Sequence, residues 1–173
     1  DSQPDSLSTA DARGFWSLGT GLLHYHPDGS LDFVDDSQGV WGGSLATTLS
    51  DGSLIVAFPS HLPQISFGQP SWCIVTAYAA EGTPRWTQVL PGQGPCTKLA
   101  VDSTDTIWVR DQDALAALSA DGVMGNSDAN ADLVGRPIAD VVARPQGGAA
   151  TAAAHPARVV ALDTHLGSVW IAD

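Results

Sequence analysis

The chain repeats a short pattern in which a β-rich segment runs into a glycine-centred turn and a second β-rich segment follows. Four segments share this pattern: 23–33, 76–86, 116–123 and 160–170. When these segments are aligned on their turn glycines (Gly29, Gly82, Gly122 and Gly167), an apolar Tyr or Leu recurs at one strand position, one residue further back in the fourth. Glycine suits such a turn because the hairpin needs a positive φ. The repetition predicts several copies of one antiparallel unit.

A second strand–turn–strand pattern precedes three of these segments, at 49–56, 99–109 and, in degenerate form, 141–150. Each complete unit therefore has four strands in about 40–50 residues, which is the period of a propeller blade. The apolar runs are short and bounded by Gly, Pro, Asp or Asn, as strands are. The best helix candidate, 111–120, fits a repeat strand equally well. We predict an all-β fold of propeller-type, four-stranded antiparallel blades, about four in number.

The last repeat carries the motif Ala-x-Asp-x-x-x-Gly-x-x-x-Trp, with one residue missing before the tryptophan. The matching residues are Ala161, Asp163, Gly167 and Trp170. Residues 82–86 keep the Gly-to-Trp spacing, but Ala79 and Glu81 depart from the rest of the motif. Over most of residues 15–173 the chain thus resembles bacterial propellers with repeats like those of pyrroloquinoline-quinone (PQQ) enzymes and of the outer-membrane assembly lipoprotein. Members of this family are enzymes, scaffolds and binders, so the resemblance implies an architecture rather than an activity.

The repeats divide the chain into a lead-in and one repeat domain. Residues 1–13 are polar and carry no apolar period, which predicts a flexible segment, and residues 14–173 form the domain. Within the domain we expect units at 15–49, 50–92, 96–135 and 137–173, the first without its innermost strand.

So few blades fall short of the usual seven or eight and predict an open arc, whose end faces and sheet edges natural proteins avoid exposing. We expect the rest of a longer polypeptide, a second copy or a different protein subunit to cover the ends. A compact four-bladed ring is the alternative.

Charge and cysteine content restrict the partners and the compartment. Seven basic and 19 acidic residues give a net charge of −12, which opposes binding to nucleic acid and to anionic membranes. No apolar run is long enough for a transmembrane helix. Cys73 and Cys96 predict one disulfide and hence an extracytoplasmic protein (periplasmic, cell-surface or secreted); two buried thiols are the alternative. The scarcity of lysine suits an exported bacterial protein. The start of the chain fits either a removed signal peptide or a piece of a longer chain.

Two patterns resemble metal sites. His24 and His26 alternate on one strand and so share a face, as zinc or copper ligands do, although a polar strand face is the alternative. Residues 126–132 place oxygen ligands at every second position, as calcium loops do. These ligands are Asn126, Asp128, Asn130 and Asp132. The sixth position is Ala131 rather than glycine and no carboxylate stands at the twelfth, so a surface loop is the alternative. No cofactor is firmly implied.

No residue pattern marks a catalytic site, and an enzyme of the PQQ class would need adjacent cysteines and a full ring. Trp41 and Trp72 lie near glycine- and proline-rich loops and are the predicted anchors for a protein partner. The leading hypothesis is a non-catalytic binding or scaffolding module, an extracytoplasmic subunit of a larger assembly. The alternative is a fragment of a propeller enzyme (hydrolase, lyase or quinoprotein-type oxidoreductase) whose active site is completed by absent blades.

Overall fold

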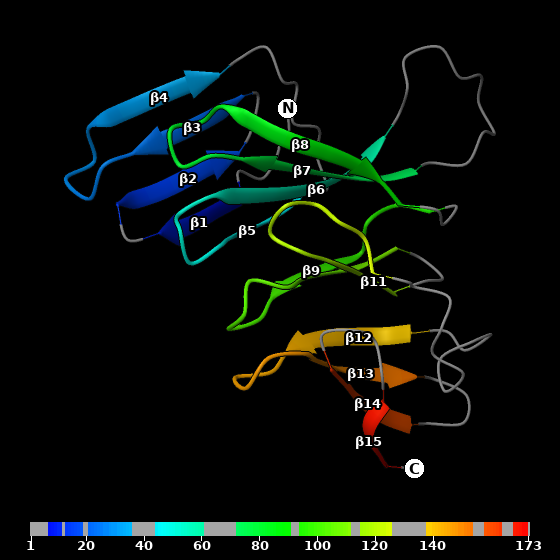
Figure 1. Ribbon diagram of the computed structural model, residues 1–173. Helices are drawn as coiled ribbons and strands as arrows, with labels where there is room; N and C mark the ends of the chain where they lie inside the picture. The colour runs from blue at the N-terminus through cyan, green and yellow to red at the C-terminus, as the bar shows by residue number, and fades with distance from the viewer. Residues whose placement is uncertain are drawn as a thin grey trace, which may run out of the picture.

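The computed structural model consists of antiparallel sheets that follow one another along the chain (Figure 1). It describes residues 7–11, 13–18, 21–35, 44–60, 72–90, 94–111, 115–125, 138–153, 158–163 and 168–172. All the regular elements within these ranges are strands. The same ranges contain no helix that could cross a membrane.

The first two sheets have four strands each, joined in chain order. Blade 1 consists of β1 (Leu7–Asp11), β2 (Gly14–Leu18), β3 (Leu22–Tyr25) and β4 (Leu31–Asp35). Blade 2 consists of β5 (Leu45–Thr48), β6 (Leu54–Ser60), β7 (Trp72–Tyr78) and β8 (Pro84–Val89). In both sheets each strand pairs with the next one along the chain, which is a meander.

The last two sheets repeat this meander. Blade 3 consists of β9 (Lys98–Val101), β10 (Ile107–Arg110) and β11 (Leu115–Leu118), and a single bridge from Leu118 to Met124 stands at the place of a fourth strand. Blade 4 consists of β12 (Ile138–Ala143), β13 (Ala149–Ala153), β14 (Arg158–Leu162) and β15 (Ser168–Ala172). The protein is therefore an all-β protein of about four propeller-type blades.

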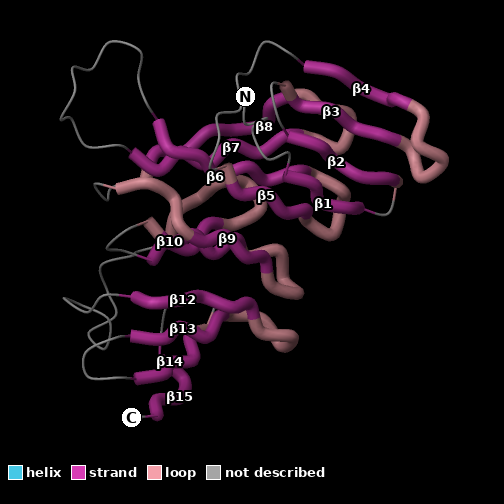
Figure 2. The backbone as a smooth tube through the Cα atoms, turned by 180° about the vertical axis from the view of Figure 1, so that it is seen from behind, coloured by secondary structure: helices cyan, strands magenta, loops and turns pink. Residues whose placement is uncertain are grey.

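The blades stand in a row with their first strands side by side. β1 neighbours β5, β5 neighbours β9, and β9 neighbours β12. These inner strands line the place of a propeller axis, and the later strands of each blade lie progressively further out. Blades 1 and 4 form the two ends of the row, and both views show them well apart (Figures 1 and 2).

Side chains alternate between the two faces of each blade, as the twofold period of strands requires. We call the face toward the next blade along the chain the forward face, and the opposite one the rear face. In blade 2, Val75 and Ala77 on the forward face join a core cluster with blade 3, whereas Leu54 and Tyr78 on the rear face join a cluster with blade 1. Blades 3 and 4 share a third cluster around Trp108.

Six hairpin turns have the same hydrogen bonds, which explains the repeated glycines. In each, the first residue donates its N–H to the carbonyl of the residue four further on, and the fourth residue donates back to the first. These turns begin at His26, Leu49, Ala79, Asp102, Ser119 and Arg144. The fourth residue has φ between 59° and 87° and is glycine in all but one turn, where it is Asp105. Aspartate is one of the few other residues that tolerate this conformation.

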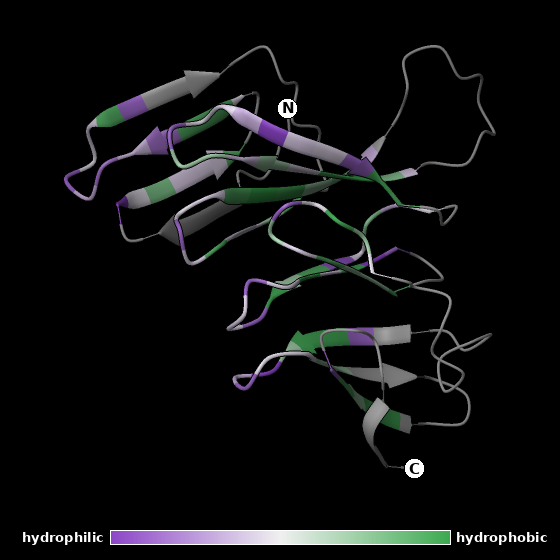
Figure 3. Ribbon diagram, viewed as in Figure 1, coloured by the Kyte–Doolittle hydropathy of each residue, from purple (hydrophilic) through white to green (hydrophobic). Residues whose placement is uncertain are grey.

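Buried apolar residues concentrate on the second and third strands of the blades and hydrophilic ones in the turns, and the apolar clusters lie between blades. Figure 3 shows this distribution along β6 and in the hairpin that follows β9. Burial of both faces of a blade removes apolar surface from water, which supplies most of the stabilisation in such a stack.

The structure differs from the sequence-based division at the start of the chain. Residues 7–11, within the expected flexible lead-in, form β1 and pair with β2. Blade 1 therefore has its innermost strand, and β5, which we placed at the end of the first unit, begins blade 2. Apart from β1, the division of the chain into a flexible lead-in (1–13) and a repeat domain (14–173) remains a prediction.

Candidate interaction faces

The forward face of blade 4 is partly open to solvent, since Val142 and Val159 are exposed, although Ala161 on the same face is only 7% exposed. Its residues are Val142, Ala150, Val159 and Ala161, from three strands. Val159 is 41% exposed, whereas Val75, at the equivalent position of blade 2, is fully buried. Val142 is 60% exposed. Apolar side chains on this face have no neighbouring blade against which to pack among the described residues.

The rear face of blade 1 is open in the same way at the other end of the row. It carries Phe15, Ser17, Leu23, Tyr25 and Leu31. Phe15 is 37% exposed, whereas its equivalent Leu54 in blade 2 is fully buried. Its ring stacks on Tyr25, with the ring centroids 4.9 Å apart. Leu31, which pairs with Tyr25, is 53% exposed. The two ends together form a pair of partly apolar faces of the kind that marks interaction sites.

The junction between blades 2 and 3 shows how two blades of this chain dock. Trp86 Nε1 donates a hydrogen bond to the Ala120 carbonyl at 2.9 Å. Arg85 reaches both sides of the junction, with Nη1 3.2 Å from Asp51 Oδ2 and Nη2 3.5 Å from Asp121 Oδ1. The indole thus supplies apolar contact and one specific hydrogen bond, and the guanidinium supplies a partly solvated ion pair.

The junction between blades 3 and 4 depends on Asp102, a buried carboxylate in the turn that follows β9. One oxygen, Oδ2, accepts from Trp108 Nε1 at 3.1 Å and from the Gly148 N–H of blade 4 at 2.6 Å. The other, Oδ1, accepts from the N–H groups of Thr104 and Thr106. Burial alone would raise the pKa of Asp102, but hydrogen bonds from the hydroxyl and N–H of Thr104, from the Trp108 indole and from the Gly148 N–H outweigh it and hold the pKa below its ordinary value of 3.8.

The two histidines singled out from the sequence meet at one carboxylate. His24 Nδ1 lies 3.0 Å from Asp32 Oδ2, and His26 Nε2 lies 3.4 Å from Asp32 Oδ1. His24 is 1% exposed and packs on Trp16, with ring centroids 4.4 Å apart, whereas His26 is half exposed. The hydrogen bond from His24 is the main reason that the pKa of Asp32 is lowered. The three residues form a polar cluster at the base of the turn centred on Gly29.

The predicted metal sites remain predictions. Within the described ranges no group of three or more His, Cys, Asp or Glu side chains is arranged to hold a metal ion. The candidate calcium ligands lie outside the described residues. These are Asn126, Asp128, Asn130 and Asp132.

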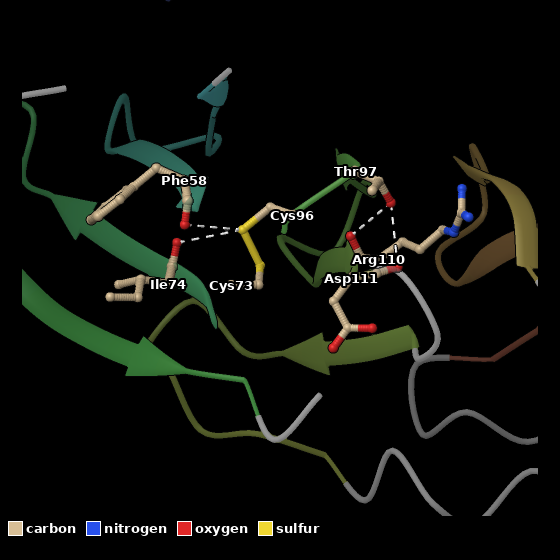
Figure 4. Close-up of a disulfide and its surroundings, with 7 residues drawn as sticks. All are labelled: Phe58, Cys73, Ile74, Cys96, Thr97, Arg110 and Asp111. Carbon is tan, nitrogen blue, oxygen red and sulfur yellow. Dashed lines mark hydrogen bonds between the residues drawn. A yellow bond between two sulfur atoms is a disulfide. The ribbon is translucent and has the colours of Figure 1, made fainter. Parts of the chain in front are cut away.

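The predicted disulfide is present. Cys73 in β7 is joined to Cys96, which precedes β9, with a Cα–Cα distance of 4.7 Å (Figure 4). It ties blade 2 to the start of blade 3. Both cysteines are buried, and Cys96 Sγ lies 3.4 Å from the Phe58 carbonyl oxygen. Because a disulfide sulfur carries no hydrogen, this is a close packing contact rather than a donated bond.

The predicted partner anchors remain predictions. Trp72 begins β7 opposite Ser60 and is half-buried. Trp41 lies outside the described residues.

Sequence reasoning missed Asp32 and Asp102, and it predicted open end faces without identifying the residues that form them. For Asp102 a signal was available, because it stands at the first position of its turn, where Leu49 and Arg144 stand in the equivalent turns. The exposure of Val159 carries no such signal, since a valine in a strand is equally expected in a core.

These blades and their open ends define a propeller-type repeat protein in the form of an arc. No protein-family model matches the chain. No curated protein matches it by sequence.

Solved structures do resemble the fold. A protein of unknown function from Bacteroides caccae aligns with a TM-score of 0.57 and 15% identity, over 96% of this chain and 59% of that one. A streptogramin B lyase aligns with a TM-score of 0.47 and 11% identity, over 99% of this chain and 69% of that one. The chain thus spans about three-fifths of the length of the Bacteroides caccae protein. The likeness to the Bacteroides caccae protein concerns the fold alone.

Proposed function

We propose that this protein is a non-catalytic binding and scaffolding module that works as a subunit of a larger assembly. The observation that carries the proposal is the exposure of apolar side chains at both ends of the row. Val159 and Phe15 are exposed at positions that are buried in blade 2. A row of blades with an uncovered face at each end gains stability when a protein surface covers these end faces. Half-buried Trp72, together with Trp41, is a further proposed contact for a partner.

We also propose that the module acts outside the reducing cytosol. The buried Cys73–Cys96 disulfide supports this, because such bonds persist in oxidising compartments. The net charge of −12 supports a protein partner over nucleic acid or an anionic membrane. The relationship to PQQ-like repeats is part of the proposal and rests on the motif at 161–170.

The size of the native particle tests the proposal. The full chain is purified under oxidising conditions from the compartment where it accumulates, and the particle is weighed by native mass spectrometry. We expect a mass above that of one chain, 17.9 kDa. Val142→Asp should shrink the particle, whereas Val89→Asp, which alters a valine of similar exposure away from the ends, should not. A lone 17.9 kDa chain in the native source would contradict the proposal.

The alternative, a fragment of a propeller enzyme, is favoured by one feature. The His24–Asp32 pair orients a buried imidazole, as acid–base sites do. The enzyme alternative predicts that a metal or cofactor copurifies with the chain and is lost in the His24→Gln variant. Catalytic turnover by the assembled particle that disappears in the same variant would favour this alternative over the scaffold.

A further inference from the structure

The contact of Trp86 with the turn of the next blade depends on a glycine. A Cβ built on Gly122 would lie 2.6 Å from Trp86 Cδ2, so any other residue there would collide with the indole. Gly122 is buried and has φ +78°. A tryptophan on the outer strand of one blade therefore docks on the glycine turn of the following blade.

Strand register puts Trp170 at the position of Trp86. Trp86 pairs with Ala77, and Trp170 pairs with Ala161, in both cases next to an irregularity in the ladder. Ala77 and Ala161 are equivalent residues on the forward faces of blades 2 and 4. The tryptophan position of blade 4 thus belongs to the forward face, which has no neighbouring blade, and no described turn lies beyond it in the row.

The first blade holds the complementary half of this contact. The turn centred on Gly29 has φ +83° and the same two hydrogen bonds as the turn centred on Gly122. Unlike Gly122 it is exposed, and a Cβ built on it meets no heavy atom within 4 Å among the described residues. The glycine turn of blade 1 is therefore an unoccupied receiving surface of the kind that Trp86 fills between blades 2 and 3.

We propose that Trp170 of one copy docks on the Gly29 turn of a second copy, so that two four-bladed arcs close head to tail into one ring. This inference rests on the proposed function, in which the end faces bind protein, and it names the partner. A second copy fits because one chain carries both halves of the junction. In a closed pair, each copy contributes blade 4 to one junction and blade 1 to the other.

The surfaces around the two halves agree with this pairing. Val142 and Val159 are exposed on the forward face of blade 4, and Phe15 and Leu31 are exposed on the rear face of blade 1. In the proposed pair, apolar surface therefore meets apolar surface. Each copy carries a net charge of −12, so the two copies repel at long range. Because salt screens that repulsion, the association should tighten as the ionic strength rises.

Light scattering after gel filtration of the purified chain tests the pairing. We expect twice the chain mass of 17.9 kDa, with dissociation at dilution. Gly29→Asn keeps a residue that tolerates positive φ but fills the receiving surface, and Trp170→Ala removes the docking side chain. Each variant alone should weaken dimerisation at least about tenfold, which corresponds to about 1.4 kcal/mol. Val142→Asp should act likewise without touching the tryptophan, and Val89→Asp is the matched surface control.

Mixing the two variants gives the sharpest result. A mixed pair of Gly29→Asn and Trp170→Ala chains has one intact junction and one doubly altered junction, whereas either variant alone has two damaged junctions. The mixture should therefore recover dimer that neither variant forms alone. Circular dichroism of each variant establishes that it is folded; if Trp170→Ala is not, Val142→Asp takes its place as the folded forward-face variant in the same mixing test.

Three outcomes overturn the inference. They are a wild-type chain that stays at 17.9 kDa at every concentration, a dimer that is indifferent to these variants, and a mixture that shows no recovery. A purified monomer that enters a larger native particle with another polypeptide would end this inference and leave the proposed function standing. A native particle of one chain alone would end both.

Discussion

Asp102 in blade 3 accepts a hydrogen bond from the backbone N–H of Gly148 in blade 4, with 2.6 Å between Oδ2 and the nitrogen. The same oxygen accepts from the Trp108 indole, whose ring lies in the core cluster that the two blades share. One carboxylate therefore closes its own turn and joins two sheets. At the junctions between blades 2 and 3 and between blades 3 and 4, such polar contacts are set into an apolar interface.

Asp102→Ala should lower the free energy of unfolding by about 3 kcal/mol, because it leaves several buried donors unsatisfied. The measurement is urea denaturation at one fixed protein concentration. Asp28→Ala is the control, because Asp28 also accepts from the backbone and side chain of a turn residue, Ser30, but is exposed. It should cost less than about 1 kcal/mol. Equal losses in the two variants would show that Asp102 does not join the blades.

The stability supplied by Asp102 should depend on pH in a defined direction. Its pKa in the folded chain lies below the ordinary value of 3.8, so the charged form is favoured by folding. The stabilisation is therefore complete above pH 3.8 and declines as the pH falls through the lower folded value. The difference in unfolding free energy between wild type and Asp102→Asn should be constant near neutral pH and shrink in acid. A difference that grows on acidification would contradict this assignment.

Removing the disulfide should destabilise the chain while leaving the blades recognisable. The Cys73–Cys96 bond closes a loop with a sequence separation of 23. The double variant Cys73→Ala, Cys96→Ala should lose about 3 kcal/mol, since the cross-link restricts the unfolded chain. Thermal unfolding of the wild type with and without reductant checks this value independently. Full resistance of the wild type to reductant, with no change in melting temperature in the double variant, would show that the bond adds no stability.

Alanine should be tolerated differently in two turns with the same backbone. Gly29→Ala meets no neighbour and should cost about 1–2 kcal/mol for its positive φ. Gly122→Ala has the same conformational cost and also collides with Trp86, which should add at least about 1 kcal/mol. Chemical denaturation of both variants in a monomeric background, such as Trp170→Ala, gives the comparison. Equal costs would mean that the indole does not pack on Gly122.

The hairpin turns could be predicted from the sequence because their backbone conformation favours a particular residue type. Positive φ at the fourth turn position selects glycine, and Gly29, Gly82 and Gly122 lie where the repeats predicted. The first strand has no such signature in the sequence, since Leu7–Asp11 is short and mostly polar. It is a strand because β2 and the neighbouring β5 hold it, and those contacts are tertiary.

The candidate sites were less predictable than the fold. The cysteine pair was evident because only two cysteines exist. His24 stood out because the equivalent repeat positions carry alanine, but its partner Asp32 lies across a turn, and only the bulged register brings the two together. The end faces are open because blades 1 and 4 each have a neighbouring blade on one side only, which is a property of the arrangement and not of any local pattern.

The central claim is that the four blades form an open arc whose end blades do not meet within one chain. Double electron–electron resonance measures this directly, with spin labels on cysteines introduced at Leu31 and Val142 and with an excess of unlabelled chain to suppress distances between copies. A second pair at Val89 and Val123 gives the reference distance for adjacent blades. The open arc predicts a markedly longer distance for the end pair than for the reference pair. An end-pair distance as short as the reference would mean that the four blades close into a ring, and would contradict the account.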